Sequence, residues 1–159
     1  RGIGNVKAIQ LKCIGELAKR IASTSRREQI TLQSARSIAE YFMEQLRHEP
    51  QEHLMLAMFD NKSMLIGEKL LSTGTSNAAL ISARDIYRTA LQYQAAYVVV
   101  LHNHPSGNPE PSREDILVTR KIKACGELLD ILLMDHIIIG DNRYFSFREQ
   151  DILFEKGRD

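Results

Sequence analysis

Several features that would assign this chain to a special class of protein are missing from its sequence. Its 159 residues contain no tryptophan and only two cysteines. Cys13 and Cys125 lie far apart in two separate helical patterns, so neither a disulfide framework nor a cysteine-based zinc site is expected. We interpret both as free or buried thiols of a cytoplasmic protein, because the cytoplasm keeps thiols reduced.

Long apolar runs and a strong charge of one sign are also missing. No stretch of eighteen apolar residues occurs and no secretory signal pattern opens the chain, so neither membrane insertion nor export is expected. The formal net charge is +1, and a balanced total gives no general case for nucleic-acid binding, which needs a basic face. The sequence has the composition of an ordinary globular domain with one core.

Two histidines stand where a predicted strand meets a stiff loop. Residues 96–101 form a short apolar run rich in β-branched side chains, which predicts a buried strand. His102 and His104 follow this run two positions apart, so their side chains point to the same side. Residues 105–111 contain three prolines and a glycine, which rule out a continued strand or helix. This setting indicates a pair of metal ligands.

A carboxylate completes the candidate metal site. Ser112 opens a new helical pattern, and Asp115 lies in its first turn, where it can face back toward the histidines. Two imidazoles and one carboxylate give zinc three protein ligands and leave one position for water, as in catalytic sites. The same two residues also fit a helix capping box, so capping and metal chemistry remain alternatives for them. His48 and His53 lack any such setting, and we interpret both as surface residues.

The spacing of the four site residues matches a known signature. The pattern of the JAMM (MPN+) metallopeptidases is matched by four residues of this chain. One residue separates His102 from His104, seven separate His104 from Ser112, and two separate Ser112 from Asp115. An HNH nuclease is disfavoured, because its three named residues come from separate places in a ββα unit.

A longer stretch of the chain resembles one bacterial family. Residues 102–115, 133–140 and 144–149 are similar to the RadC family, and the resemblance extends over about residues 31–151. It implies a cytidine-deaminase-like α/β fold of the JAMM/MPN type, with a mixed β-sheet flanked by helices and a short N-terminal helical segment.

The resemblance also implies roles for the site residues. It implies that His102, His104 and Asp115 bind Zn²⁺, and that Ser112 supports the oxyanion and the bound water. The implied activity is that of a zinc-dependent peptidase or isopeptidase, in which zinc-bound water attacks the carbonyl of a protein or peptide substrate. Two other functions stay open, namely a DNA-binding accessory protein of repair or recombination and a non-catalytic scaffold stabilised by its metal.

The general base is less clearly marked in the sequence. Glu49, Glu52 and Glu68 are the upstream candidates. Glu52 stands directly before an apolar run, residues 53–59, that ends at a predicted turn, residues 60–62, so it opens the first strand of a hairpin. The base of the JAMM pattern opens the first strand, and the resemblance therefore implies that Glu52 is catalytic.

The first residues have a different organisation. The segment from Gly2 to Lys7 begins with a Gly-Ile-Gly turn. An amphipathic helical pattern follows over residues 6–21, and residues 22–29 are polar and loop-like. This resembles the second half of a helix-hairpin-helix motif. The resemblance implies weak, non-specific contact with DNA phosphates when the full hairpin is present. A plain glycine turn before a helix is an equal alternative. We divide the chain into this segment, residues 1–30, and the metallopeptidase-like domain, residues 31–159.

The remaining patterns predict an alternation of helices and strands. Thr31 is expected to cap the first helix of the domain, and Ser82 a later one. Asp135 and His136 interrupt an apolar run, where they either brace the site or form a structural hydrogen-bond pair. Helices are predicted at 34–47, 83–94 and 113–129, and strands at 53–59, 63–71, 131–139 and 143–147.

Overall fold

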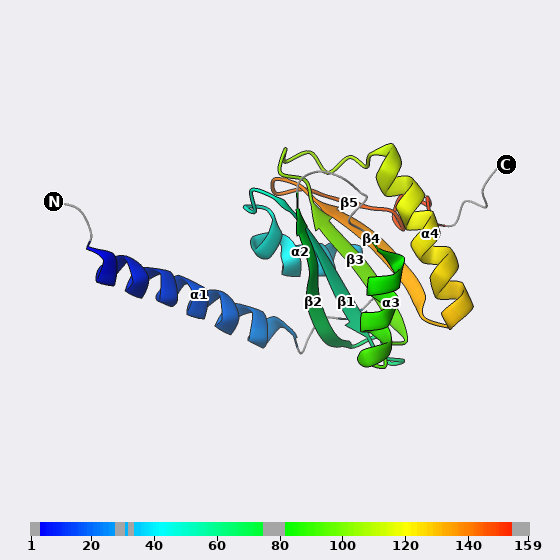
Figure 1. The fold of residues 1–159 in the computed structure, drawn as a ribbon, viewed down its shortest axis with the longest axis horizontal. Helices are drawn as coiled ribbons and strands as arrows, with labels where there is room; N and C mark the ends of the chain where they lie inside the picture. The colour runs from blue at the N-terminus through cyan, green and yellow to red at the C-terminus, as the bar shows by residue number, and fades with distance from the viewer. Residues whose placement is uncertain (1–3, 28–30, 32–33, 75–81, 154–159) are drawn as a thin grey trace.

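The structure is a computed structural model that describes residues 4–27, 31, 34–74 and 82–153, with backbone alone for residues 19–27. Its centre is a five-stranded sheet with the strand order β2-β1-β3-β4-β5. β3 and β4 are parallel, and every other neighbouring pair is antiparallel. The predicted mixed sheet flanked by helices is confirmed (Figure 1). The strands are β1 (Glu52–Phe59), β2 (Leu65–Gly74), β3 (Tyr97–Asn103), β4 (Leu132–Ile139) and β5 (Tyr144–Ser146).

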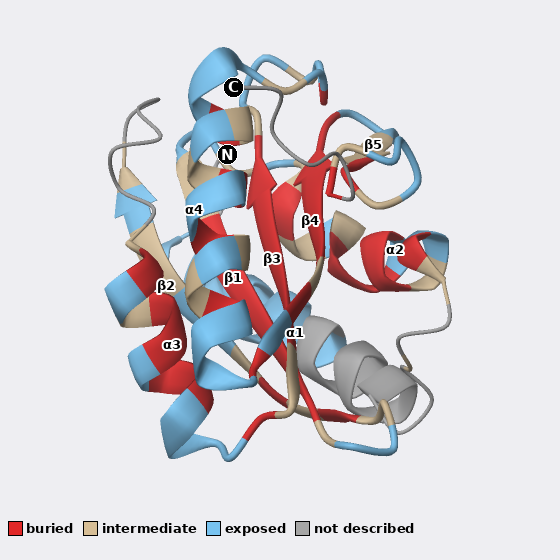
Figure 2. Ribbon diagram, turned by 90° about the vertical axis from the view of Figure 1, so that its right-hand side faces the viewer, coloured by how far each residue is buried: buried red, intermediate tan, exposed pale blue. Residues whose placement is uncertain are grey.

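Helices cover both faces of the sheet, as Figure 2 shows. α2 (Ala35–Leu46) packs on one face, and α3 (Ala83–Gln92) and α4 (Arg113–Leu129) pack on the other. Along β3, Val99 faces the α2 side while Val98 and Val100 face the α3 and α4 side. A strand buried on both faces needs an unbroken apolar run, which explains why this strand could be recognised from the sequence.

The N-terminal helix α1 (Asn5–Arg27) projects away from the sheet (Figure 1). It runs six residues beyond the predicted end at residue 21, so the prediction of a loop over residues 22–27 was wrong. That segment contains neither glycine nor proline, and its polar side chains do not by themselves stop a helix. Gly2 and Ile3 of the predicted turn lie outside the described residues.

The apolar side chains of α1 are largely exposed, although the helix is amphipathic. Val6, Ile9, Ile14 and Leu17 are each between 58 and 70% exposed.

Within the described ranges, no helix combines the length and the apolar character needed to span a bilayer.

The start of α2 differs from the prediction. Its N-cap is Ser34, whose side chain accepts a hydrogen bond from the N–H of Ser37, and not Thr31. Thr31 instead forms an isolated antiparallel bridge with Met64, the residue directly before β2, and this pairing holds it away from the helix. The helix cap at Ser82 and the bounds of α4 are confirmed.

The β1–β2 hairpin is longer than its sequence pattern indicated. β2 continues past residue 71 to Gly74, which lies opposite Glu52, the first residue of β1. Gly74 is the last residue of β2. The hairpin therefore places Glu52 at the end of two paired strands, which is the same end of the sheet at which β3 finishes with His102 and Asn103.

Candidate metal centre

The central strands and one helix N-terminus bring the predicted ligands together. His102 lies opposite Leu54 of β1 and Ile138 of β4, so strands flank it on both sides. Its neighbours on the same face of β3 pack under α4. Since α4 begins at Arg113, just after the proline-rich loop, its first turn carries Asp115 to this end of the strand. His102 and Asp115 are buried, at 3 and 4% exposure.

Three ligating groups converge at this point. Nε2 of His102 lies 3.0 Å from Nε2 of His104. Oδ1 of Asp115 lies 3.4 Å from Nε2 of His102, and Oδ2 lies 3.6 Å from Nε2 of His104. In the part of the chain that the structure describes, this is the one group of three or more potential metal ligands, with ligand atoms within 4.8 Å of one another.

The other nitrogen of each ring is already bonded. Nδ1 of His102 lies 2.8 Å from Nε2 of His136, and Nδ1 of His104 lies 2.8 Å from the carbonyl oxygen of Asn108. Because the Nδ1 atoms have these partners, the Nε2 atoms are the ones left to face the Asp115 carboxylate. Two imidazoles and a carboxylate aimed at one point form a donor set that zinc accepts, so the residues fit a zinc ion.

Ser112 and Asp115 form the capping box that the sequence allowed. The Ser112 hydroxyl accepts a hydrogen bond from the N–H of Asp115, and Oδ2 of Asp115 accepts one from the N–H of Ser112. The same carboxylate faces both histidines. Of the two alternatives that the sequence presented, capping is confirmed, and the same cap places the Asp115 carboxylate where it could also bind a metal.

Glu52 is the acid that interacts with the cluster. Burial raises the pKa of Glu52, the neighbouring His104 lowers it, and Asp115 raises it again, with a net increase. Glu68 lies opposite Ala57, on the face of the sheet covered by α2, and Oε2 of Glu49 lies 3.9 Å from Nε2 of His53. Among the described residues, then, neither alternative acid is placed at the histidine cluster.

The two histidines have opposite electrostatic surroundings. Burial lowers the pKa of His102 to about 4, although the Asp115 charge opposes it. The contact with Asp115 raises the pKa of His104 above its usual value. Burial alone would raise the pKa of Asp115, but His104, His102 and Ser112 together hold it well below its usual range. With its pKa lowered to about 4, His102 is a neutral imidazole at neutral pH.

The adjacent polar residues of β4 have separate roles, which the sequence left open. His136 is fully buried and contacts His102, with its ring stacked on Phe147 at a centroid distance of 4.9 Å. Asp135 accepts hydrogen bonds from the N–H of His136 and from the Ser146 hydroxyl. His136 thus supports a candidate ligand, whereas Asp135 has structural partners.

Asn103 is a further residue at the site, and sequence reasoning missed it. Its side-chain oxygen accepts a hydrogen bond of 2.7 Å from the N–H of His53, and its amide donates to the carbonyls of Glu49 and Gln51. Asn103 thereby ties the end of β3 to the segment that carries Glu52. The available signal in the sequence was an asparagine between the two candidate ligands. His53 itself is half-buried rather than a surface residue, with a side chain 17% exposed.

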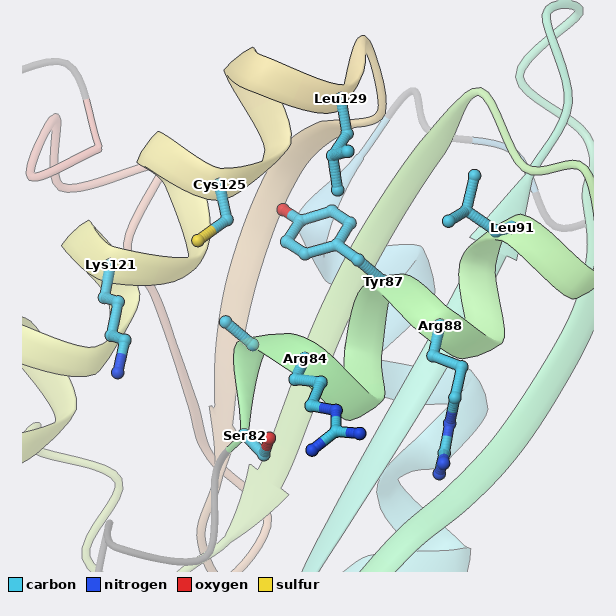
Figure 3. A pocket seen from close by; sticks show the side chains of 9 residues that line it. Ser82, Arg84, Tyr87, Arg88, Leu91, Lys121, Cys125 and Leu129 are labelled. Atoms are coloured by element: carbon cyan, nitrogen blue, oxygen red, sulfur yellow. The ribbon is translucent and has the colours of Figure 1, made fainter.

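A hollow of the molecule lies between α3 and α4, and none of the residues that line it belongs to the histidine cluster (Figure 3). Tyr87, whose hydroxyl donates to the carbonyl of Ile122, forms part of its wall. Its lining contains neither a histidine nor a carboxylate, so it offers no acid–base or metal chemistry of the kind found at the cluster. The lining residues are Ser82, Ala83, Arg84, Tyr87, Arg88, Leu91, Lys121, Cys125 and Leu129.

Comparison with known proteins gives consistent matches over most of the chain. Residues 32–152 match the family described as RadC-like JAB domain. A UPF0758 protein of Clostridium novyi is 40% identical over 153 residues, which cover 96% of this chain and 67% of the relative. A UPF0758 protein of Bacillus velezensis is 40% identical over 152 residues, covering 96% of this chain and 66% of the relative.

A third relative, the UPF0758 protein of Enterococcus faecalis, is 38% identical over 151 residues, with 95% of this chain and 65% of the relative covered. The chain therefore spans about two thirds of the length of these curated relatives. Their names state no enzymatic activity.

Proposed function

The chain belongs to the RadC-like JAB domain family, and on that basis we propose that it is a zinc-dependent hydrolase of peptide or isopeptide bonds. The observation that carries the proposal is the convergence of three ligating groups, with Nε2 of His102 3.0 Å from Nε2 of His104 and both near the Asp115 carboxylate. Zinc sites with three protein ligands are typically catalytic, whereas structural sites have four.

Zinc held by these residues would supply a Lewis acid that lowers the pKa of water and polarises a carbonyl group. The protein must then move a proton from the attacking water to the leaving amine. Glu52 suits this role because it interacts with His104 and Asp115, and because its raised pKa brings it closer to the range of an efficient general base. Ser112 is the candidate donor to the developing oxyanion.

The Ser112 hydroxyl has another partner in the structure. It lies 2.6 Å from Oδ2 of Asp115. To donate to a carbonyl oxygen, this hydroxyl must release the carboxylate, and zinc binding to Asp115 would favour that release by drawing charge away from Oδ2. A scaffold stabilised by its metal would require neither a coordination position left open for water nor Glu52, and for that reason we rank it below the hydrolase.

The direct test is cleavage of a mixed peptide library by the zinc-loaded chain, with the products identified by mass spectrometry. We expect cleavage by the wild type and none by Glu52→Gln, while Glu49→Gln, which changes an acid paired with His53, should cleave normally. Cleavage by Glu52→Gln at the wild-type rate would contradict the assigned base. For isopeptide substrates, Glu52→Gln also serves to trap protein targets in cells.

Weak DNA contact is a second candidate function, favoured by the start of α1. This helix begins at Asn5 and has no acidic residue in its first turn, and Lys7 lies within it. The unpaired N–H groups and positive dipole of such a helix end suit a phosphate group. This contact would be independent of the candidate zinc site, because it would use other residues and would bind a phosphate group and not a metal ion.

A further inference from the structure

A chain of short contacts runs behind His102, from one candidate ligand to the backbone of another. Nδ1 of His102 lies 2.8 Å from Nε2 of His136, and Nδ1 of His136 lies 2.6 Å from Oγ1 of Thr119. Oγ1 of Thr119 in turn donates to the carbonyl oxygen of Asp115 at 2.5 Å. None of these four residues is more than 4% exposed, so water does not compete for these bonds.

The carbonyl oxygen of Asp115, at the end of this chain of contacts, fixes the direction of every hydrogen bond in it. A backbone carbonyl only accepts, so the single hydroxyl proton of Thr119 points to Asp115. The oxygen of Thr119 must then accept from Nδ1–H of His136. A neutral imidazole carries one N–H, so Nε2 of His136 has a lone pair and accepts from Nδ1–H of His102. Nε2 of His102 is consequently free of a proton.

We propose that His136 and Thr119 are positioning residues that hold His102 in the tautomer with a free Nε2, the form that can bind a metal. The inference rests on the proposed zinc site and adds two residues to it. Ligand histidines generally donate their second N–H to a fixed acceptor. His104 follows that rule directly, since its Nδ1 faces the carbonyl of Asn108.

His102 differs because its partner is another imidazole. A carbonyl can only accept, but an imidazole nitrogen either donates or accepts, according to its own tautomer. His136 alone would therefore leave the tautomer of His102 undetermined. Thr119 resolves this ambiguity, because the Asp115 carbonyl fixes the hydroxyl. Phe147, stacked on the His136 ring with an interplanar angle of 11°, holds the ring in the plane that both bonds require.

The proposal makes a prediction about the zinc-free protein. In ¹⁵N-histidine NMR spectra of the full chain, the wild type should show His102 protonated on Nδ1 and unprotonated on Nε2. Thr119→Val keeps the shape of the side chain but removes the hydroxyl, so it should give a mixture of tautomers at His136 and His102. Zinc affinity should fall about 10- to 100-fold, the usual effect of losing a partner of a ligand histidine.

Matched variants separate positioning from general packing. Ser146→Ala removes a buried hydroxyl that donates to the neighbouring Asp135. This variant should leave the tautomer of His102 unchanged and the zinc affinity within about twofold of the wild type. His136→Phe fills the space without an acceptor and should weaken zinc binding. His136→Gln retains an oxygen that can accept from Nδ1–H of His102 and should restore part of the affinity.

Two results would overturn the inference. One is a wild-type His102 that carries its proton on Nε2 in the zinc-free protein. The other is wild-type zinc affinity in Thr119→Val and in both His136 variants. Failure of the wild type itself to bind zinc would instead contradict the proposed function, while the NMR measurement would still decide the tautomer.

Discussion

Ser112 and Asp115 are joined by three hydrogen bonds. The hydroxyl and the N–H of Ser112 both donate to Oδ2 of Asp115, at 2.6 and 2.8 Å, and the N–H of Asp115 donates back to Oγ of Ser112 at 3.1 Å. The cap of α4 is thus also the device that aims the carboxylate at His102 and His104. Helix stability and ligand orientation are coupled through this single pair.

The first prediction concerns that coupling. Ser112→Ala should lower the free energy of unfolding of the zinc-free protein by about 1 kcal/mol, the usual effect of losing an N-cap. Ser112→Thr keeps a hydroxyl and should retain most of the stability. Urea unfolding followed by circular dichroism measures both, and equal stability of wild type and Ser112→Ala would show that the cap bonds contribute nothing.

Glu52 should act in proton transfer without binding the metal. Glu52→Gln is therefore expected to keep one zinc per chain while losing hydrolysis by at least about 100-fold. Because the pKa of Glu52 is raised above 4.5, activity of the wild type should fall as the pH is lowered through that raised value, where the base becomes protonated. Zinc analysis and a pH–rate profile test this, and joint loss of zinc and activity would make Glu52 a ligand.

Asp135 should make stability depend on pH in the mildly acidic range. Burial raises its pKa from 3.8 to about 6, although the Ser146 hydroxyl opposes the shift. The folded state therefore holds this proton more tightly than the unfolded state, so the stabilisation is complete below pH 3.8 and is lost as the pH rises to about 6.

The Asp135→Asn variant isolates this contribution. Its amide does not titrate, so the difference in unfolding free energy between wild type and variant should change by about 1–3 kcal/mol across that pH interval. Urea unfolding at several pH values measures the difference. A constant difference would mean that Asp135 has the same pKa in the folded and unfolded states.

DNA binding should be weak and independent of zinc. Contacts to phosphates alone carry no sequence information and weaken steeply with salt, so this chain should bind labelled duplex DNA negligibly at physiological salt. Addition of a chelator should change nothing, because the start of α1 shares no residue with the histidine cluster. Tight binding that is lost with the chelator would favour a metal-dependent nucleic-acid function over hydrolysis.

The parts of the fold that follow from local pattern were predictable. The apolar run of β3, the capped start of α3 at Ser82 and both ends of α4 agree with the sequence-based expectations. Each depends on contacts within one element, or on burial so complete that the strand had to be continuously apolar. The convergence of His102, His104 and Asp115 followed in the same way, from one strand end, one loop and one helix start.

The remaining features depend on contacts between distant segments. Thr31 and Ser34 are both suitable caps, and the bridge from Thr31 to Met64 decides between them. Asn103 acts on a segment about fifty residues earlier in the chain, and His136 reaches His102 only through the parallel pairing of β3 and β4. No local pattern contains these partners, so the sequence could mark the residues but could not assign their roles.

A zinc titration of the purified chain decides whether His102, His104 and Asp115 hold one zinc ion. We expect one zinc per wild-type chain, little or none for the double variant His102→Ala/His104→Ala, and normal binding for His48→Ala, which changes an exposed histidine. Affinity should fall as the pH is lowered, because the raised pKa of His104 lets protons compete for its Nε2. Unchanged zinc content in the double variant would mean that the two histidines are not metal ligands.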